Sequence, residues 1–245
     1  MQPERKSARQ LYAEAERAAQ ERLVQGRPLR LSPWAEAGGD EATIYLYDAI
    51  GGWFGITAAD FVRDLQGITA STIHLRINSP GGGVFEAEAM QTALQQHPAR
   101  IIAHIDGLAA SAAGFVALAA DEIEMADGAF FMIHNAWGVA VGDATEMLDY
   151  AAMLEKMDAN LVRDYRRKTG HSAERIATWM QAETWLSAAE ALDLGFVDRV
   201  FTPKSQKKDE DQPAARVSNA SFNQHQNIGC SASRARALRL MEVGI

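Results

Sequence analysis

Ser111 is the residue of this sequence with the clearest potential for chemistry. It lies among small side chains in the segment Gly107–Gly114, directly after the mostly apolar run Ile101–Ile105. A serine at a turn from strand to helix can act as a nucleophile, because the tight turn exposes its hydroxyl and the helix N-terminus offers free N–H groups. The alternative is a small-residue helix packed tightly against a neighbour, in which Ser111 only saves space.

Two further segments could complete a catalytic site around this serine. His134 follows the apolar run Phe130–Ile133, and histidine is the usual base that activates a serine near neutral pH. The glycines Gly81–Gly83 follow another apolar run, where they let backbone N–H groups face a ligand at close range. A neutral histidine also needs a third group, usually a carboxylate, that fixes its tautomer. The alternatives are a capped core histidine and an ordinary glycine turn.

The order of apolar and amphipathic segments predicts alternating strands and helices. Strands are expected at 42–47, 72–77, 100–105, 122–125, 129–133 and 196–200. Helices are expected at 58–65, 84–96, 112–120, 144–168, 172–180 and 188–194. This alternation is typical of an α/β fold with mainly parallel strands. Because ligand sites in such sheets lie at the carboxyl ends of the strands, we expect the three segments above to meet at one edge.

Composition and charge narrow the class of protein. The 245 residues are 47% hydrophobic and 23% charged, which is typical of one sizeable globular domain. The single cysteine, Cys230, excludes an internal disulfide framework and favours a reducing compartment. Residues 41–200 carry a net charge of −12 between slightly basic ends, which argues against nucleic-acid binding. The uncharged stretch 107–120 has 14 residues, too few to span a membrane, and no signal peptide is expected at the start.

Other kinds of site find little support in the sequence. No group of His, Asp and Glu has the spacing of metal ligands, so no metal and no other cofactor is predicted. No glycine-rich loop ends in Gly-Lys-Ser/Thr, so the chain carries no ATPase of that kind. Lys156 and Lys168 lie away from the strand ends, which disfavours a Ser–Lys site. His104 is expected to pack within its strand, whereas His74 could face either side of the sheet.

The chain divides into three segments by composition. Residues 1–41 are expected to be a leader, with a weakly amphipathic helix over 7–24 and a Pro/Gly-rich linker over 26–40. Residues 42–202 form the compact domain. Residues 203–245 contain a charged run and an Asn/Gln/Ser-rich stretch, and are predicted to be disordered.

Ordered motifs across residues 42–202 resemble the ClpP family of serine peptidases. The segments that carry the resemblance are Ile77–Gly82, Ala109–Gly114, Met132–His134, Trp185–Ala191 and Gly195–Asp198. Together they are far more specific than any one of them. The resemblance implies a ClpP/crotonase-like layered fold, in which the long helix 144–168 is part of a handle.

The resemblance also implies a role for each motif. Ser111 is the nucleophile of a serine peptidase and His134 is its general base. The backbone N–H groups of Gly82 and Ala112 form an oxyanion hole, where each donor contributes about 3–4 kcal/mol to transition-state stabilisation. The residues that pair with the substrate strand are Gly83 and Val84.

The third catalytic group departs from the family pattern. The family has an Asp two residues before the aromatic of the Leu-Ser-Ala segment, and this position is Glu183 in Ala182–Trp185. Glutamate is one methylene longer but can still accept the histidine N–H, so we expect Glu183 to be the third group. Asp106, five residues before Ser111, is the second candidate; its alternative is a surface carboxylate at a strand end.

The segments Asp48–Gly51 and Gly55–Ala58, together with Glu183–Leu186, are similar to ClpP-like proteases of tailed phages and prophages. This likeness implies a homo-oligomeric ring of endopeptidases that cleaves scaffold or capsid precursors during head maturation. It would act in the bacterial cytoplasm or inside the prohead, and residues 1–40 or 205–245 would be trimmed or would bind scaffold. A housekeeping ClpP-like peptidase with an ATPase unfoldase is one alternative. A crotonase-like acyl-CoA enzyme, or an inactive structural ring, is another.

Overall fold

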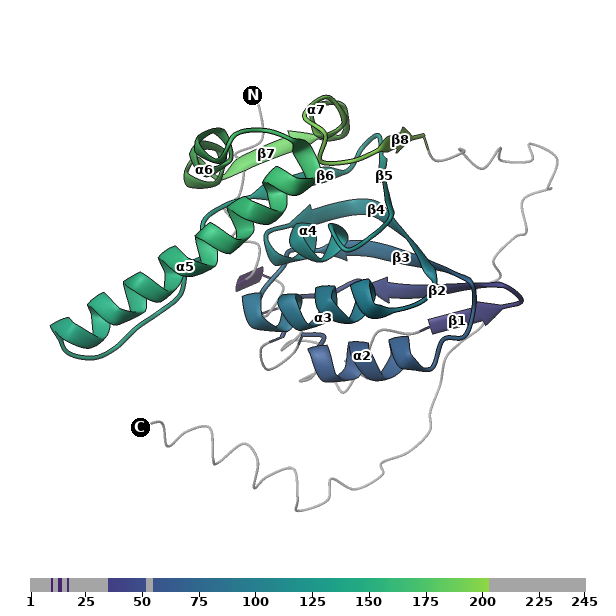
Figure 1. The fold of residues 1–245 in the computed structure, drawn as a ribbon, viewed down its shortest axis with the longest axis horizontal. Helices are drawn as coiled ribbons and strands as arrows, with labels where there is room; N and C mark the ends of the chain where they lie inside the picture. Colours follow the sequence, from purple (N-terminus) through teal and green to yellow (C-terminus); the bar gives the residue numbers. More distant parts are fainter. Residues whose placement is uncertain (1–9, 11–12, 15–16, 18–34, 52–54, 203–245) are drawn as a thin grey trace, which may run out of the picture. The chain divides into compact units, whose positions relative to one another are not determined.

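The computed structural model describes residues 10, 13–14, 17, 35–51 and 55–202 (Figure 1). Its strands are β1 (Ala35–Gly38), β2 (Glu41–Leu46), β3 (Thr72–Ser79), β4 (Arg100–Ala110), β5 (Glu122–Ala126), β6 (Phe130–Ile133), β7 (Thr184–Ser187) and β8 (Arg199–Phe201). Its helices are α2 (Ala58–Gln66), α3 (Val84–Gln96), α4 (Ala112–Ala117), α5 (Ala144–Thr169), α6 (Ala173–Gln181) and α7 (Ala188–Asp193). The helix expected over 7–24 lies almost wholly outside the described residues, and the tail 203–245 lies wholly outside them.

The strands form one eight-stranded sheet in which most neighbours are parallel. The order along the sheet is β1-β2-β3-β4-β5-β8, and β6 pairs with the far end of β4 and with β7. Only the outer pairs β1/β2 and β6/β7 are antiparallel among the described strands. The α/β fold of mainly parallel strands predicted from the sequence is therefore confirmed.

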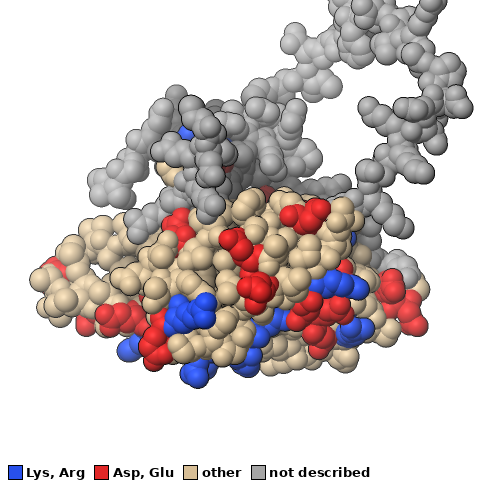
Figure 2. Space-filling view, turned by 90° about the horizontal axis from the view of Figure 1, so that it is seen from above, with Lys and Arg blue, Asp and Glu red and all other residues tan. Residues whose placement is uncertain are grey.

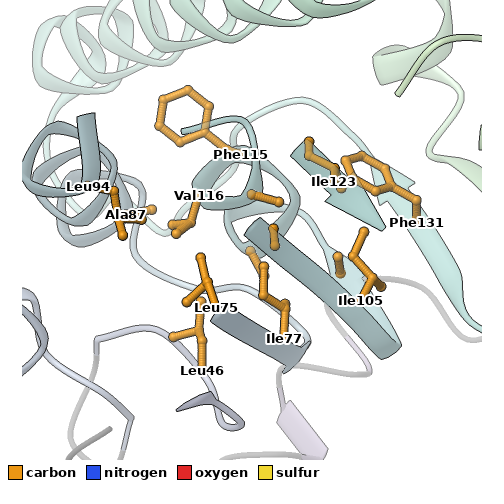
Figure 3. Packing of buried hydrophobic residues seen from close by; sticks show 14 of the residues in the cluster. Leu46, Leu75, Ile77, Ala87, Leu94, Ile105, Phe115, Val116, Ile123 and Phe131 are labelled. Atoms are coloured by element: carbon orange, nitrogen blue, oxygen red, sulfur yellow. The ribbon is translucent and has the colours of Figure 1, made fainter. Parts of the chain in front are cut away.

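One face of the sheet is buried beneath α2, α3 and α4 (Figure 1). Every second residue of β2 and of most of β3 is fully buried, as expected for strands with one face in the core. Figure 3 shows Leu46, Leu75 and Ile77 on this face, with Val116 of α4 and Leu94 of α3 above them. This packing fixes the helices that begin at the site-bearing strand ends.

The small residues around Ser111 belong to both a strand and a tightly packed helix. Strand β4 continues to Ala110, five residues beyond the predicted end, because its last residues pair with β6. Helix α4 ends at Ala117 rather than near residue 120. A Cβ on Gly114 would lie 2.8 Å from the ring of Phe131, so the helix packs against β6 at a distance that only glycine allows. The buried Gln91 amide donates a hydrogen bond to the Phe115 carbonyl, 2.9 Å away.

Two strands were not expected from the sequence. β1 lies inside the segment predicted as linker, where Gly39 and Asp40 turn the chain back into β2 and Gly39 has φ 68°. β7 pairs antiparallel with β6 over four residues, which is too short a run to give a clear alternating pattern. The strand predicted over 196–200 corresponds to β8, which begins at residue 199 and ends at residue 201.

The long helix predicted over 144–168 is α5. Asp143 and Glu146 form a capping box at its start, and Gly170 ends it in the left-handed conformation. The first half of α5 extends away from the sheet (Figure 1). Its exposed residues include Leu148, 71% exposed, and the preceding loop exposes Val141 at 95%. This part of α5 is therefore not held by the core.

The described residues include no helix that is long and apolar enough to cross a membrane. Acidic and basic side chains are interspersed on the face that Figure 2 shows, without an extended basic area among the described residues.

Polar side chains line the sheet face opposite the helices. His74 on β3 and His104 on β4 point the same way, with Nδ1 and Nε2 2.8 Å apart. The Glu124 carboxylate lies 3.2 Å from His104 Nδ1 and is itself paired with Arg199. Burial, the cation Arg76 and the second imidazole lower the pKa of His104 to about 4. The prediction that His104 is packed rather than catalytic agrees with this placement.

We predict that His104 makes the fold sensitive to mild acid. The unfolded chain binds a proton at this residue near pH 6.5, whereas the folded chain binds it only near pH 4. The free energy of unfolding should therefore fall by up to about 3 kcal/mol as the pH drops through this window. His104→Gln cannot be protonated, so its Tm should depend less on pH between 7 and 4. Equal pH slopes for the wild type and the variant would contradict the prediction.

Candidate active site

Ser111 occupies a strained turn between β4 and α4. Its backbone has φ 55° and ψ −127°, and Ser111 and Glu183 are the two residues other than glycine with positive φ in the described chain. Such strain persists only where the surroundings hold it, and it is concentrated at functional sites. Here the Ser111 N–H donates to the Met132 carbonyl at 2.8 Å, and Ala110 and Ala112 are buried on either side.

His134 lies beside this serine because two parallel strands end together. β4 and β6 pair through Ala110 and Met132, so the residues that follow each strand emerge at the same edge. His134 Nε2 is 2.6 Å from the Ser111 Oγ. This distance is within the reach that a general base needs.

The glycine loop after β3 is built against the Ser111 turn. A Cβ on Gly81 would lie 2.5 Å from the Ala110 carbonyl oxygen and 2.9 Å from the Ala112 nitrogen, and Gly81 has φ 87°. The buried Ser79 hydroxyl orders the loop, because it accepts from the Gly81 N–H at 3.1 Å and donates to the Asp48 carbonyl at 2.6 Å. No residue other than glycine could keep this approach without displacing backbone.

The predicted oxyanion donors flank Ser111. Gly82 lines the same cavity as Ser111 and His134. Ala112 is the first residue of α4, a position whose N–H has no acceptor within its helix. These placements are compatible with the predicted oxyanion hole, which stays a prediction.

Gly83 and Val84, the residues predicted to pair with the substrate strand, differ in the hydrogen bonds that their backbone groups make. The Gly83 N–H donates to the Ile50 carbonyl at 2.8 Å, and the Gly83 carbonyl accepts from the Ala87 N–H at 3.0 Å. Both backbone groups of Gly83 are therefore hydrogen-bonded within the chain, and Gly83 lines the wall of the cavity, while its pairing with substrate stays a prediction. Val84, the first residue of α3, has no acceptor for its N–H within its helix.

The cavity at Ser111 has the form of a groove between two backbone segments. Its volume is about 230 Å³, and its lining residues are Pro80, Gly82, Gly83, Val84, Ser111, His134, Ala136, Trp137 and Gly138. A second pocket of about 20 Å³, walled by Phe115, Leu161 and Tyr165, opens beneath the serine. The segment 136–138, which sequence analysis missed, forms the second wall.

Helix α5 holds that second wall. The Ala136 N–H donates to Asp158 Oδ1 at 2.6 Å. Burial raises the pKa of Asp158, and this backbone hydrogen bond counteracts the rise. A carboxylate on a core helix could not have been linked to residue 136 from sequence spacing, because 22 residues separate them.

Glu183 lies next to His134 across β6 and β7. The last pair of the antiparallel ladder is Ile133 with Thr184, so the next residues outward are His134 and Glu183. Glu183 has φ 47°, and its Oε1 accepts from the Trp185 Nε1 at 3.4 Å.

Asp106, the second candidate for the third group, is held elsewhere. Arg76 binds both of its carboxylate oxygens, and the Tyr47 hydroxyl donates to Oδ2 at 2.5 Å. Burial and this carboxylate raise the pKa of Tyr47 to about 12. These contacts favour Glu183 over Asp106.

In the described residues, no group of three or more His, Cys, Asp or Glu side chains could hold a metal ion. The groups that meet at the cavity are a hydroxyl, an imidazole and backbone N–H groups. This set can carry out nucleophilic acyl transfer.

We predict that Gly81→Ala disrupts the Ser111 turn. The added methyl group would overlap the Ala110 carbonyl, and the backbone φ of residue 81 would be strained for alanine. Together these effects should lower the free energy of unfolding by about 2–4 kcal/mol. Gly128→Ala is the matched control, because no atom lies within 4 Å of its Cβ position and its φ is not positive. Chemical denaturation of both variants tests this difference, and similar stabilities would contradict it.

Known proteins resemble this chain in sequence. The family model described as Clp protease matches residues 57–204. An ATP-dependent Clp protease proteolytic subunit 3 of Rhodococcus jostii is 34% identical over 151 residues, covering 60% of this chain and 70% of that protein. A proteolytic subunit 2 of Pseudomonas aeruginosa is 28% identical over 149 residues, covering 59% and 74%.

A solved structure supports the fold. A mutant of ClpP1 from Listeria monocytogenes superposes with a TM-score of 0.59 at 25% identity, covering 66% of this chain and 92% of that one. The family model spans more than half of the chain, including every motif on which the resemblance rested after residue 57. The chain therefore belongs to the Clp protease family.

Proposed function

We propose that this chain is a serine endopeptidase in which Ser111 is the nucleophile and His134 the general base. The observation that carries the proposal is the 2.6 Å contact between Ser111 Oγ and His134 Nε2 at a strained strand-to-helix turn. His134 takes the serine proton as Oγ attacks the scissile carbonyl, and then gives it to the leaving amine. In the second step His134 takes a proton from water, which attacks the acyl-enzyme, and then returns the proton to Ser111 Oγ as the acyl group leaves.

The backbone around Ser111 stabilises the intermediate. The N–H groups of Gly82 and Ala112 donate to the oxyanion, and they need little reorganisation because the glycine loop is locked against the turn. Glu183, the third group, accepts the other N–H of His134 and keeps the ring in the correct tautomer.

The substrate is an extended polypeptide. It lies along the groove between residues 80–84 and 136–138, where backbone on both sides can pair with it as added strands. Backbone pairing gives affinity without strong sequence preference, and the small pocket beneath Ser111 selects the side chain next to the scissile bond. No cofactor takes part in this chemistry.

The biological role that we propose is the cleavage of scaffold or capsid precursors during phage head maturation. The segments Asp48–Gly51, Gly55–Ala58 and Glu183–Leu186 support this branch. The enzyme would act as a homo-oligomeric ring in the cytoplasm of the bacterial host or inside the prohead. Trimming of 1–40 or 205–245, which lie largely outside the described residues, would accompany maturation.

A housekeeping peptidase is the second candidate role. The relatives above are named as proteolytic subunits of ATP-dependent proteases, and this favours an ATPase partner. An acyl-CoA enzyme is disfavoured, because that chemistry needs no serine nucleophile beside a histidine.

The first prediction from this mechanism concerns the serine itself. A fluorophosphonate probe should label Ser111 and no other serine, because only an activated hydroxyl reacts readily with it. Peptide mass spectrometry of the wild-type chain and of Ser111→Ala measures the site. Absence of labelling in a folded, assembled sample would overturn the peptidase proposal.

The second prediction separates the two carboxylates. Glu183→Gln should lower the labelling rate by about 10³- to 10⁴-fold, since it removes the charge that orients His134. Asp106→Asn should lower the Tm through the lost Arg76 pair but change the labelling rate little. The reverse pattern would assign the third role to Asp106.

The third prediction separates the two biological roles. Co-expression with the scaffold and capsid genes of a tailed phage should yield cleaved precursors that Ser111→Ala does not produce. Cleavage of a folded reporter that depends on an added ATP-driven unfoldase would instead favour the housekeeping role.

A further inference from the structure

A small hydrophobic cluster, separate from the main core, lies directly behind the three proposed catalytic residues. Its buried members are Ala110 and Met132, and Leu108 and Trp185 pack against them. Ala110 precedes Ser111, Met132 lies two residues before His134, and Trp185 lies two residues after Glu183. The cluster therefore joins the ends of β4, β6 and β7, the strands that carry these groups.

Trp185 contributes more than packing to this cluster. It is the cross-strand partner of Met132, and its ring meets Phe130 edge to face, with centroids 6.4 Å apart at 71°. The half-buried indole is therefore fixed on the sheet. Its Nε1 donates to Glu183 Oε1 at 3.4 Å, which is longer than the usual distance for such bonds.

Glu183 needs such an anchor because its side chain is longer than an aspartate. An extra methylene adds a rotatable bond, and each added rotamer must be suppressed if the carboxylate is to face His134. The backbone of Glu183 is already constrained, with φ 47° and its N–H donating to the Met180 carbonyl at 3.1 Å. The indole N–H adds a constraint on the carboxylate itself.

The geometry points to Trp185 as a positioning residue that holds the Glu183 carboxylate beside His134. This inference rests on the proposed function. Trp185 touches neither substrate nor the reacting atoms, and acts only through Glu183. The indole N–H binds one carboxylate oxygen and leaves the other for the imidazole.

Trp185→Phe tests the role, since it keeps an aromatic ring on the sheet and removes the N–H. We expect the rate of fluorophosphonate labelling to fall by about tenfold at its pH plateau. We also expect the acid limb of the pH–rate profile to move to lower pH, because a carboxylate held beside an imidazole stabilises its protonated form. A loss of folded protein alone would lower the plateau without moving the limb.

Two further variants separate positioning from packing. Phe130→Leu removes the edge-to-face contact but keeps the indole N–H, so it should lower the Tm and leave the acid limb in place. In a Glu183→Ala background, Trp185→Phe should have no further effect on the labelling rate, since the carboxylate that the indole would hold is absent. Additive effects, or an unmoved acid limb in Trp185→Phe, would overturn the inference.

A measurement without catalysis distinguishes this inference from the proposed function. In full-length chain labelled with nitrogen-15 tryptophan, the indole resonance lost in Trp185→Phe identifies Trp185. Glu183→Gln should shift that resonance and leave those of the other tryptophans unchanged. If the indole resonance shifts but the fluorophosphonate probe does not label the wild-type chain, the contact is supported and the peptidase proposal is overturned. If it does not shift, the positioning role is overturned.

Discussion

The parallel register of β4 and β6 is the constraint on which the rest of the site depends. Ala110 pairs with Met132, and the Ser111 N–H donates to the Met132 carbonyl at 2.8 Å. This register fixes where the chain leaves each strand, so the Ser111 hydroxyl and the His134 ring emerge within hydrogen-bonding distance. A shift by one residue would turn every side chain of β6 to the opposite face and separate the pair.

Close backbone approach is the second physical theme. The loop at Gly81 contacts the Ser111 turn through backbone atoms, and α4 approaches Phe131 through Gly114. A Cβ at Gly81 would overlap the Ala110 carbonyl, and a Cβ at Gly114 would crowd the Phe131 ring. The strain at Ser111 is the local cost of this geometry, and the buried surroundings sustain it.

The two faces of the sheet carry different kinds of side chain. The face under the helices is apolar, and it fixes the helices whose N-termini lie at the site. The opposite face carries a paired polar row that includes His74, His104 and Glu124. The side chains of this row pair with one another, whereas Ser111 and His134 lie in the segments that follow the strand ends.

The sequence alone determined the α/β class, and its motifs led to Ser111, His134 and the glycine loop, because hydrophobic periodicity and small-residue runs are local signals. Tertiary structure decided what depends on distant partners. The register of β6 and β7 places Glu183 near His134, just beyond the last pair of the ladder. The sheet also brings Arg76 and Tyr47 within hydrogen-bonding distance of Asp106. Local sequence patterns are also weak in β1, in β7 and in the segment 136–138. Pairing with neighbouring strands fixes β1 and β7, and a hydrogen bond to α5 holds residue 136. Residues far apart in sequence meet through packing, and no local signal encodes that meeting.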